Sequence, residues 1–546
     1  MKLKAVHIEL FFLAIFVITF LWNGVALIYE HKLNHNFPHG YMHRDTFEFS
    51  TMAEYIKEEG NFRNFPYYMA DGYTDTIANY PPLLMQVAAL FSLVSGLKVF
   101  DAIMLLMFLF WMCGALAMYL VIRKFSINAA IISLPFFLTR FMRWRPFWGF
   151  LQGEWISLLA LVFLVYFILA FSYIKEKRFY TIAGLFLSGI IFTHLTDFSG
   201  GVIFLVVFFI AQLIRDRKID FDVVKKLFFA SVFALAISSY SLVIQYLAGA
   251  QRSVVASLFR FKWVLEGPYV IRMSDFSFFV VFIYAGVIFS LSSLLFKKNN
   301  YAAVVGLSLL LSGNSNLIGL GRTAEARNIF PIGLAVLFSI GVYYTGKIFV
   351  KKWKIVHSVL VSIAIFLAVI MLTDNKISPP ETIMDSYHWE SLMWIKHNTP
   401  KDARIYFFYA DPYYHYYNGN YKASHRVGYN VELEDYIKSA QQGIIKDVYL
   451  SVNMGTALDF KLPYWKGFLK VGFRPEASMR FVNKSICDMD YYVFDKVTTR
   501  KGLEPLIGYN LFIKENLLKN SWIKPVWSNA VVDILKNTKP GAECVS

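Results

Sequence analysis

The sequence predicts a mainly α-helical membrane protein that carries a small α/β domain at its C-terminal end. Hydrophobic residues make up 57% of the 546 residues, and the mean hydropathy is +0.46, whereas soluble globular domains are about 45–50% apolar. The excess lies in runs of about 20 residues, the length that a helix needs to cross a hydrocarbon core of roughly 30 Å. From residue 377 onward, the pattern becomes that of an ordinary globular domain.

About eleven hydrophobic runs are predicted to cross the membrane. They are residues 7–29, 99–122, 127–140, 153–174, 179–196, 198–214, 227–248, 276–296, 301–320, 328–349 and 355–373. The short apolar run 81–97 begins with two prolines. We place it on the exterior membrane surface, because one more crossing would move the later basic clusters to the other side of the membrane.

Lysine and arginine residues set the predicted orientation, because they gather in the cytoplasmic connections of membrane proteins. Alternate connections carry Lys2 and Lys4, Arg123 and Lys124, Lys175 to Arg178, Arg215 to Lys226, Lys297 and Lys298, and Lys347 to Lys354. We therefore expect a multi-pass protein of the cell membrane, with a cytoplasmic N-terminus and an extracellular or luminal C-terminal domain. Much of the net charge of +16 then reflects orientation, and no nucleic-acid partner is expected.

Two domains are expected: a polytopic membrane domain over 1–376, with an exterior loop over 30–98, and an exterior soluble α/β domain over 377–546. In the second domain, ARIYFFYA and DYYVFDK are predicted strands, and WESLMWIKHNTP and residues 431–447 are predicted helices. Cys487 and Cys544 lie in this domain, either as a disulfide or as two free thiols. Cys113 lies in an apolar run and is expected to be inert.

The exterior loop contains the first long polar segment, HRDTFEFSTMAEYIKEEGNFRNFPYYMADGYTDTIANYPP, over residues 43–82. Residues 46–59 are predicted to form a helix that stops at Gly60, with Thr46 and Ser50 as candidate caps. A polar, acidic and aromatic loop at the mouth of a membrane domain is where we expect the chemistry.

Three groups of residues follow one another in this loop: Asp45, then Ala53-x-x-Ile56-x-x-x-Gly60, then Gly72 and Tyr80-Pro81-Pro82-Leu83. This order resembles the first exterior loop of the GT-C class of membrane glycosyltransferases. The resemblance is strongest to a microbial branch known as membrane proteins related to 6-pyruvoyl-tetrahydropterin synthase. The stretch from Trp389 to Ala403 is similar to the opening of the exterior domain in many of these enzymes.

The sequence also departs from two subfamilies of this class. The oligosaccharyltransferase signature WWDYG is absent, and the C-terminal domain has Tyr409-Ala410-Asp411-Pro412-Tyr413-Tyr414 instead. Protein O-mannosyltransferases carry an Asp-Glu pair, whereas Asp45 is followed by Thr46. Both subfamilies are therefore disfavoured.

The resemblance implies inverting transfer of a sugar from a polyprenyl- or dolichyl-phosphate donor to a lipid-linked glycan, glycolipid or glycoprotein acceptor. A carboxylate takes the proton of the acceptor hydroxyl as the glycosidic bond forms. The phosphate leaves as a stable anion, so basic groups rather than a general acid assist its departure. No cofactor is certain. A divalent metal stays open, because one carboxylate is too few to argue for an ion.

Asp45 is the first candidate for the catalytic base. The alternative role for this residue is an N-terminal cap of the following helix, where Asp is favoured. Glu48 lies one turn further on and is a runner-up. Glu154 is the other runner-up, because acids at the rim of a membrane domain are functional candidates by default.

Basic and aromatic residues in the exterior loops are the candidate ligands of the donor phosphate and substrate. They are Arg44, Arg143, Arg145, Arg260, Arg322, Arg327 and Tyr80. Contact with lipid headgroups or anchoring in the interface is the alternative for Arg44, Arg143 and Arg145. For Arg327, the alternative is an ion pair with Glu325. His194 and Asp197 end another helix, where we expect a mutual hydrogen bond.

Two other classes of function remain open from the sequence. A transporter or flippase has similar composition, but transporters commonly contain internal repeats and broken helices at the bilayer midplane. No clear repeat is found here, and the polar residues cluster outside the membrane. A membrane scaffold with a binding ectodomain is the third alternative, and it leaves the loop over 43–82 unexplained.

Overall fold

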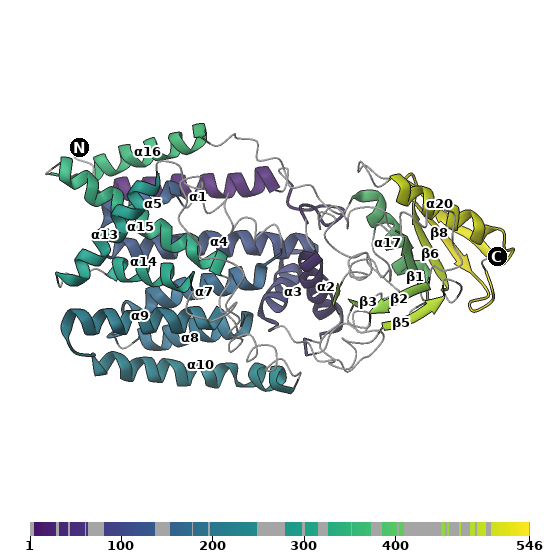
Figure 1. Ribbon diagram of the computed structural model, residues 1–546, viewed down its shortest axis with the longest axis horizontal. Coiled ribbons are helices and arrows are strands. Elements are labelled where there is room, and N and C mark those ends of the chain that lie inside the picture. The colour runs from purple at the N-terminus through teal and green to yellow at the C-terminus, as the bar shows by residue number, and fades with distance from the viewer. Residues whose placement is uncertain are drawn as a thin grey trace.

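The computed structural model places a helical bundle at one end of the molecule and a small mixed sheet with helices at the other (Figure 1). It describes residues 5–28, 32–41, 44–60, 62–63, 81–136, 153–176, 178–194, 197–247, 279–296, 301–314, 326–350, 352–372, 385–400, 403, 405–408, 449–453, 456–457, 469–470, 481–485, 487, 489–497 and 504–544.

A helix lies on each of the predicted hydrophobic runs. These helices are α1 (Ala5–Ile28), α4 (Val99–Arg123), α5 (Ile127–Phe136), α7 (Trp155–Phe171), α8 (Phe179–Thr193), α9 (Phe198–Asp216), α10 (Phe221–Leu247), α13 (Phe279–Leu295), α14 (Tyr301–Ser312), α15 (Ala326–Phe349) and α16 (Ile355–Leu372). Helix formation follows from apolar runs whose backbone groups must bond to one another inside a membrane.

Three of the described helical stretches are long and apolar enough to cross a membrane on their own. They are Val99–Arg123, Phe221–Ile244 and Ile332–Phe349. Other described helices contain shorter apolar stretches of 10–17 residues, and at about 1.5 Å per residue such a stretch is shorter than the hydrocarbon core. The predicted number of eleven spans therefore stays a prediction.

Helices α13 and α15 approach each other closely because both carry a glycine at the contact. A Cβ atom at Gly286 would lie 1.8 Å from the carbonyl oxygen of Leu337. A Cβ atom at Gly341 would lie 1.8 Å from the carbonyl oxygen of Phe282. Small residues at such contacts are typical of helix pairs that pack within membranes.

The basic connections that the structure describes lie at the end of the bundle away from the C-terminal domain, which we call the basic end (Figure 1). Lys124 follows α4 and donates a hydrogen bond to the carbonyl of Ser172, which follows α7. Lys175 forms an ion pair with Asp220, before α10. Arg123 pairs with the buried Glu9 of α1, so the first and fourth helices are joined at this end.

Two shorter helices, α2 (Arg44–Glu59) and α3 (Leu83–Ser95), lie between the bundle and the C-terminal domain (Figure 1). The predicted stop at Gly60 is confirmed, since Gly60 has φ +67° and its N–H bonds to the carbonyl of Ile56. The expectation that Thr46 or Ser50 caps α2 is wrong, because the helix already begins at Arg44 and both residues are buried within it.

The apolar stretch over 81–97 forms the 13-residue helix α3, which ends at Gly96 in the left-handed conformation. Its length is about 20 Å at 1.5 Å per residue. This is too short for a crossing and agrees with a surface position.

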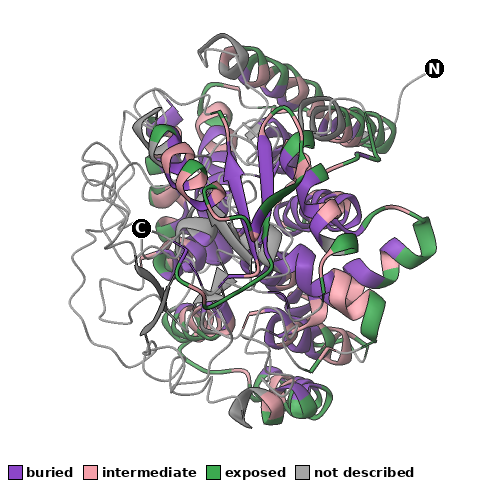
Figure 2. Ribbon diagram, turned by 90° about the vertical axis from the view of Figure 1, so that its right-hand side faces the viewer, coloured by how far each residue is buried: buried purple, intermediate pink, exposed green. Residues whose placement is uncertain are grey.

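The C-terminal domain is built on a four-stranded mixed sheet of order β1-β6-β8-β7. Its elements are α17 (Ser386–Asn398), β1 (Ile405–Phe408), β6 (Tyr491–Asp495), α20 (Glu504–Leu518), β7 (Ile523–Ser528) and β8 (Val532–Asn537). β1 and β6 are parallel, and the other two pairs are antiparallel. Every residue of β6 is buried, and buried strands lie at the centre of the view in Figure 2.

Two further strand pairs extend this domain. They are β2 (Tyr449–Asn453) with β5 (Phe481–Ser485), and β3 (Thr456–Ala457) with β4 (Leu469–Lys470). The predicted strands at ARIYFFYA and DYYVFDK and the helix at WESLMWIKHNTP are confirmed as β1, β6 and α17. The helix expected over 431–447 and the domain boundary at 376/377 lie outside the described residues.

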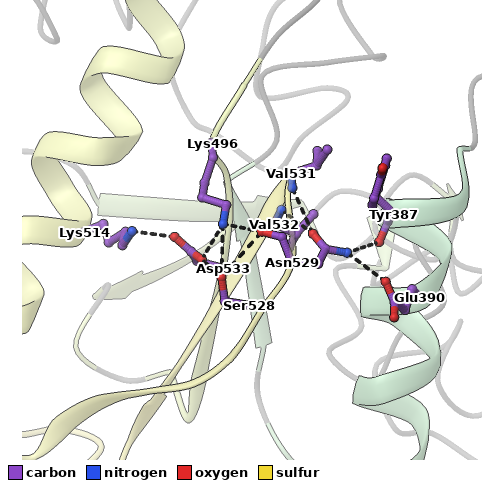
Figure 3. A network of polar contacts seen from close by, with 9 residues as sticks. All are labelled: Tyr387, Glu390, Lys496, Lys514, Ser528, Asn529, Val531, Val532 and Asp533. Carbon is purple, nitrogen blue, oxygen red and sulfur yellow. Dashed lines mark hydrogen bonds and ion pairs between the residues drawn. The ribbon is translucent and has the colours of Figure 1, made fainter.

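Covalent and polar contacts hold the C-terminal domain together. Cys487 and Cys544 form a disulfide, which decides between the two alternatives left by the sequence. Asp533 pairs with Lys496 and Lys514 and accepts a hydrogen bond from Ser528 (Figure 3).

A second buried cluster ties α17 to the sheet. His388 lies between two carboxylates, with Nδ1 at 2.6 Å from Asp385 and Nε2 at 3.0 Å from Asp495. Burial alone would lower the pKa of His388, but the charges and hydrogen bonds of Asp495 and Asp385 outweigh it and raise this pKa to about 10. His388 is therefore an imidazolium at neutral pH.

This cluster predicts a pH dependence of the stability of the C-terminal domain. An unfolded histidine has a pKa of about 6.5, so the folded state binds the proton more tightly than the unfolded state does. The stabilisation is fully present below about pH 6.5 and is lost as the pH rises toward 10. We expect the thermal unfolding midpoint to fall across this window in the wild-type protein and to fall less in His388→Gln.

His397 lies on the same helix with an exposed side chain and provides the matched control. The variant His397→Gln should keep the pH slope of the wild-type protein. Identical slopes in the wild-type protein and His388→Gln would contradict this account of the cluster.

Candidate functional site

Segment 32–41, between α1 and α2, is hydrogen-bonded to the start of α4. The carboxylate of Asp101 is buried and holds His35 twice: Oδ2 accepts from the backbone N–H at 2.8 Å, and Oδ1 lies 2.8 Å from ring Nδ1. Lys98 donates to the carbonyl of His35, also at 2.8 Å. Three hydrogen bonds therefore fix one residue of this segment, and the ring of His39 stacks on that of His35 at 4.7 Å.

Tyr41 connects three helices near the end of this segment. Its hydroxyl donates a hydrogen bond of 3.0 Å to the carbonyl of Phe100 in α4. The same side chain is hydrogen-bonded to Ser50 of α2. Its ring meets the indole of Trp155, the first residue of α7, edge to face at 5.5 Å. Tyr41, Ser50 and Trp155 are all buried, so we call this contact the Tyr41 hub.

The electrostatics of the hub keep Tyr41 uncharged. Burial raises the pKa of its phenol well above the ordinary value, the hydrogen bond from Ser50 opposes this, and the negative charges of Asp101 and Glu54 raise it further. A neutral phenol keeps its proton, so Tyr41 remains a hydrogen-bond donor to the carbonyl of Phe100 at every physiological pH.

We call the end of the bundle that contains segment 32–41, α2, α3 and the first turns of α4 and α7 the mouth. It faces the C-terminal domain (Figure 1), and Phe100 meets Trp389 of α17 edge to face at 5.7 Å. The mouth is therefore at the opposite end of the bundle from the basic end.

The structure places the predicted acids at the mouth. Asp45 and Glu48 are the second and fifth residues of α2, and the positions of their side chains lie outside the description. Asp45 is four residues from Tyr41, so their Cα atoms are at most about 15 Å apart. Because α2 begins at Arg44, Asp45 lies inside its first turn and not at the cap position.

Glu154 lies beside the same hub. It immediately precedes Trp155 and is half-buried, and its side chain makes no capping hydrogen bond to α7. The structure thus brings the start of the helix that bears Asp45 and Glu48 to the same end of the bundle as Glu154.

Most of the predicted phosphate ligands lie outside the described residues. Tyr80, Arg143, Arg145, Arg260 and Arg322 fall in segments that the structure does not describe. Arg44 and Arg327 are described only as backbone, at the first turns of α2 and α15. Their roles stay predictions.

A second polar cluster lies where α7 meets the turn between α8 and α9. Oδ2 of the buried Asp197 accepts from the hydroxyl of Ser157 at 2.8 Å and lies 2.8 Å from Nδ1 of His194. The expected hydrogen bond between His194 and Asp197 is confirmed. The hydrogen bond from Ser157 to Asp197 was not predicted from the sequence. Within the described ranges, no three His, Cys, Asp or Glu side chains gather in a way that could hold a metal ion.

Sequence reasoning missed the residues that fix the mouth, namely His35, Tyr41, Lys98 and Asp101. Asp101 offered a signal, because it is an acid at the start of a long apolar run, and such acids usually have a specific partner. The partner lies 66 residues away in the sequence.

No protein-family model matches this sequence, and no curated protein matches it significantly. Two solved structures, by contrast, have a similar fold over nearly the whole chain. The Archaeoglobus fulgidus oligosaccharyltransferase tethered to an acceptor peptide with the NVT sequon covers 95% of this chain and 79% of its own, with 12% identity and a TM-score of 0.50. ArnT from Cupriavidus metallidurans in the apo state covers 98% of both chains, with 12% identity and a TM-score of 0.50.

Both proteins are GT-C glycosyltransferases. The chain has the GT-C fold. The predicted resemblance to this class is therefore confirmed at the level of the fold.

Other structures of the same two proteins give lower scores. In its apo form, the oligosaccharyltransferase is matched over only 58% of its length, with 14% identity over 72% of this chain and a TM-score of 0.46. ArnT bound to undecaprenyl phosphate matches 69% of this chain and 68% of its own, with 14% identity and a TM-score of 0.45. The likeness to the oligosaccharyltransferase does not extend to the WWDYG signature, which this chain lacks.

Proposed function

We propose that this protein is an inverting glycosyltransferase that moves a sugar from a polyprenyl- or dolichyl-phosphate to an acceptor at the exterior membrane face. The observation that carries this proposal is the GT-C fold over nearly the whole chain, combined with a mouth at which Asp45 lies in the first turn of α2 and α7 begins beside Glu154. The fold favours this function over the transporter and scaffold alternatives. The eleven-span topology, with the mouth outside and the basic end inside, is part of the proposal.

In the proposed mechanism, the carboxylate of Asp45 takes the proton of the acceptor hydroxyl while its oxygen attacks the anomeric carbon. The bond between the sugar and the phosphate breaks, and polyprenyl phosphate leaves with the electron pair. Glu48 and Glu154 are the alternative bases. The acceptor is a lipid-linked glycan, a glycolipid or a glycoprotein.

In this mechanism, arginine side chains balance the charge that develops on the leaving phosphate, because charge-assisted bonds to phosphate are strong and often bidentate. The candidates are Arg44, Arg143, Arg145, Arg260, Arg322 and Arg327, and Tyr80 is a further candidate ligand of the substrate. ArnT is known to bind undecaprenyl phosphate, and we propose a lipid phosphate of this class as the carrier here.

The arginine assignment predicts weaker binding of the donor lipid when these side chains are removed. Arg143→Ala, Arg322→Ala and Arg327→Ala should each raise the Kd for a polyprenyl phosphate by about 10- to 100-fold where the residue contacts the phosphate, since a hydrogen bond to a charged group contributes about 1.5–3 kcal/mol. The measurement is a binding titration with undecaprenyl phosphate in detergent.

Arg217→Ala is the matched control, because Arg217 is exposed at the basic end, between α9 and α10. Its removal should leave the Kd unchanged. Unchanged affinity in all three variants would rule out the assignment of these arginines to the donor phosphate.

A further inference from the structure

We propose that Tyr41 is a positioning residue. Its hydroxyl fixes the position of α2 and thereby the position of Asp45 relative to the acceptor hydroxyl. The inference rests on the proposed function, because the Tyr41 hub can position a catalytic base only if Asp45 is that base. It adds a residue that does not touch the substrate but determines where the base is held.

The hydroxyl of Tyr41 joins two helices that belong to different parts of the chain. It donates to the carbonyl of Phe100 in α4 and shares a hydrogen bond with Ser50 in α2. Filling space at a fully buried site needs only a phenyl ring, and a phenol there must satisfy its polar group. The hydroxyl is therefore a specific link between α2 and the bundle.

The buried face of α2 shows what this link controls. Thr46, Phe49, Ser50 and Ala53 are all buried and recur at the spacing of one helix face. Asp45 precedes the first of them, so its position depends on how α2 is rotated and how far it slides along its axis. The bond from Ser50 to Tyr41 is a directional contact on this face, and the apolar contacts around it are not directional.

The residues around Tyr41 make further contacts within the mouth and with α17. Upstream, His35 is fixed by Asp101 and Lys98, so segment 32–41 cannot shift along α4 without breaking three hydrogen bonds. Towards the C-terminal domain, Phe100 contacts Trp389. The start of α2 thus follows a segment that is hydrogen-bonded to α4, and such contacts help a base to remain within reach of its proton.

The test is a double-mutant cycle with Tyr41→Phe and Asp45→Asn in the full-length protein. Tyr41→Phe keeps the ring on Trp155 and removes only the hydroxyl. We expect it to lower kcat by about 10-fold with little change in donor KM, since small misplacements of a catalytic group cost up to about 100-fold. In the Asp45→Asn background, the same change should cost almost nothing, because the group that it positions is already gone.

Two further variants keep the result interpretable. Ser50→Ala removes the other partner of the hydroxyl and should reproduce the loss in kcat, which keeps the inference testable if Tyr41→Phe does not fold. Tyr119→Phe is the matched control: its buried hydroxyl donates to Glu9 at 2.7 Å at the basic end. Tyr119→Phe should leave kcat unchanged even if its thermal unfolding midpoint falls.

The outcomes separate this inference from the proposed function. An active wild-type enzyme with equal losses from Tyr41→Phe in both backgrounds would overturn the inference alone, because the hydroxyl would then act independently of Asp45. Wild-type kcat in both Tyr41→Phe and Ser50→Ala would also overturn it. Absence of transfer by the wild-type protein would overturn the proposed function and this inference with it.

Discussion

Replacing Asp45 by Asn is expected to lower turnover by about 10²–10⁴-fold, the loss typical of a removed general base. Donor binding should stay close to that of the wild-type protein, because the amide keeps the size and most of the hydrogen bonding of the carboxylate. The measurement is kcat in the purified enzyme, together with the Kd for polyprenyl phosphate.

The size of this loss separates catalysis from a structural role. Asp45 lies in the first turn of α2, where its charge interacts with the helix dipole for about 0.3–1 kcal/mol. A 10²–10⁴-fold loss of rate corresponds to about 2.7–5.5 kcal/mol, which the dipole cannot supply. Glu59→Gln, an exposed residue at the other end of the same helix, is the control and should retain full turnover. Near-normal turnover in Asp45→Asn would move the base to Glu48 or Glu154, or refute the mechanism.

Removing the disulfide is expected to produce the second largest effect. Cys487 and Cys544 are 57 residues apart, and closing a loop of this length restricts the unfolded chain by about 4 kcal/mol. Both cysteines are buried, and the N–H of Gly541 bonds to the carbonyl of Cys487. The variant Cys487→Ser/Cys544→Ser should therefore lower the free energy of unfolding of the C-terminal domain by about this amount, as measured by guanidinium titration.

Cys113→Ser is the control for the disulfide variant, because Cys113 is a free cysteine in α4. Its unfolding curve should match that of the wild-type protein, and reducing agent should destabilise both. Equal stability of the wild-type protein and the double variant would show that the disulfide does not constrain this domain.

Local sequence patterns were sufficient to predict most of the elements. The long apolar runs predicted the bundle helices, and Gly60 predicted the end of α2. Short β-branched and aromatic runs predicted β1 and β6. These features depend on residues near one another in the chain, which is why they can be read without a structure.

The mouth could be located from the sequence, but its internal contacts could not. The pairing of Asp101 with His35 and the bonds of Tyr41 to Phe100 and Ser50 depend on how α2 and α4 pack. A sequence shows that an acid lies in an apolar run, but it does not show which residue is the partner of that acid. The start of α2 at Arg44 was likewise not predicted. Thr46 and Ser50 are residue types that often cap helices, but here they lie within α2 and are buried.

The proposed reaction moves a sugar from a lipid monophosphate to an acceptor with inversion at the anomeric carbon. The most direct measurement incubates the reconstituted protein with radiolabelled polyprenyl- and dolichyl-phosphate sugars and with the lipids and glycoproteins of its own membrane. We expect transfer of label to an acceptor, release of one polyprenyl phosphate per sugar and an inverted anomeric centre by NMR, all lost in Asp45→Asn. Retention of the anomeric configuration, or no transfer from any of these donors, would contradict the proposed reaction.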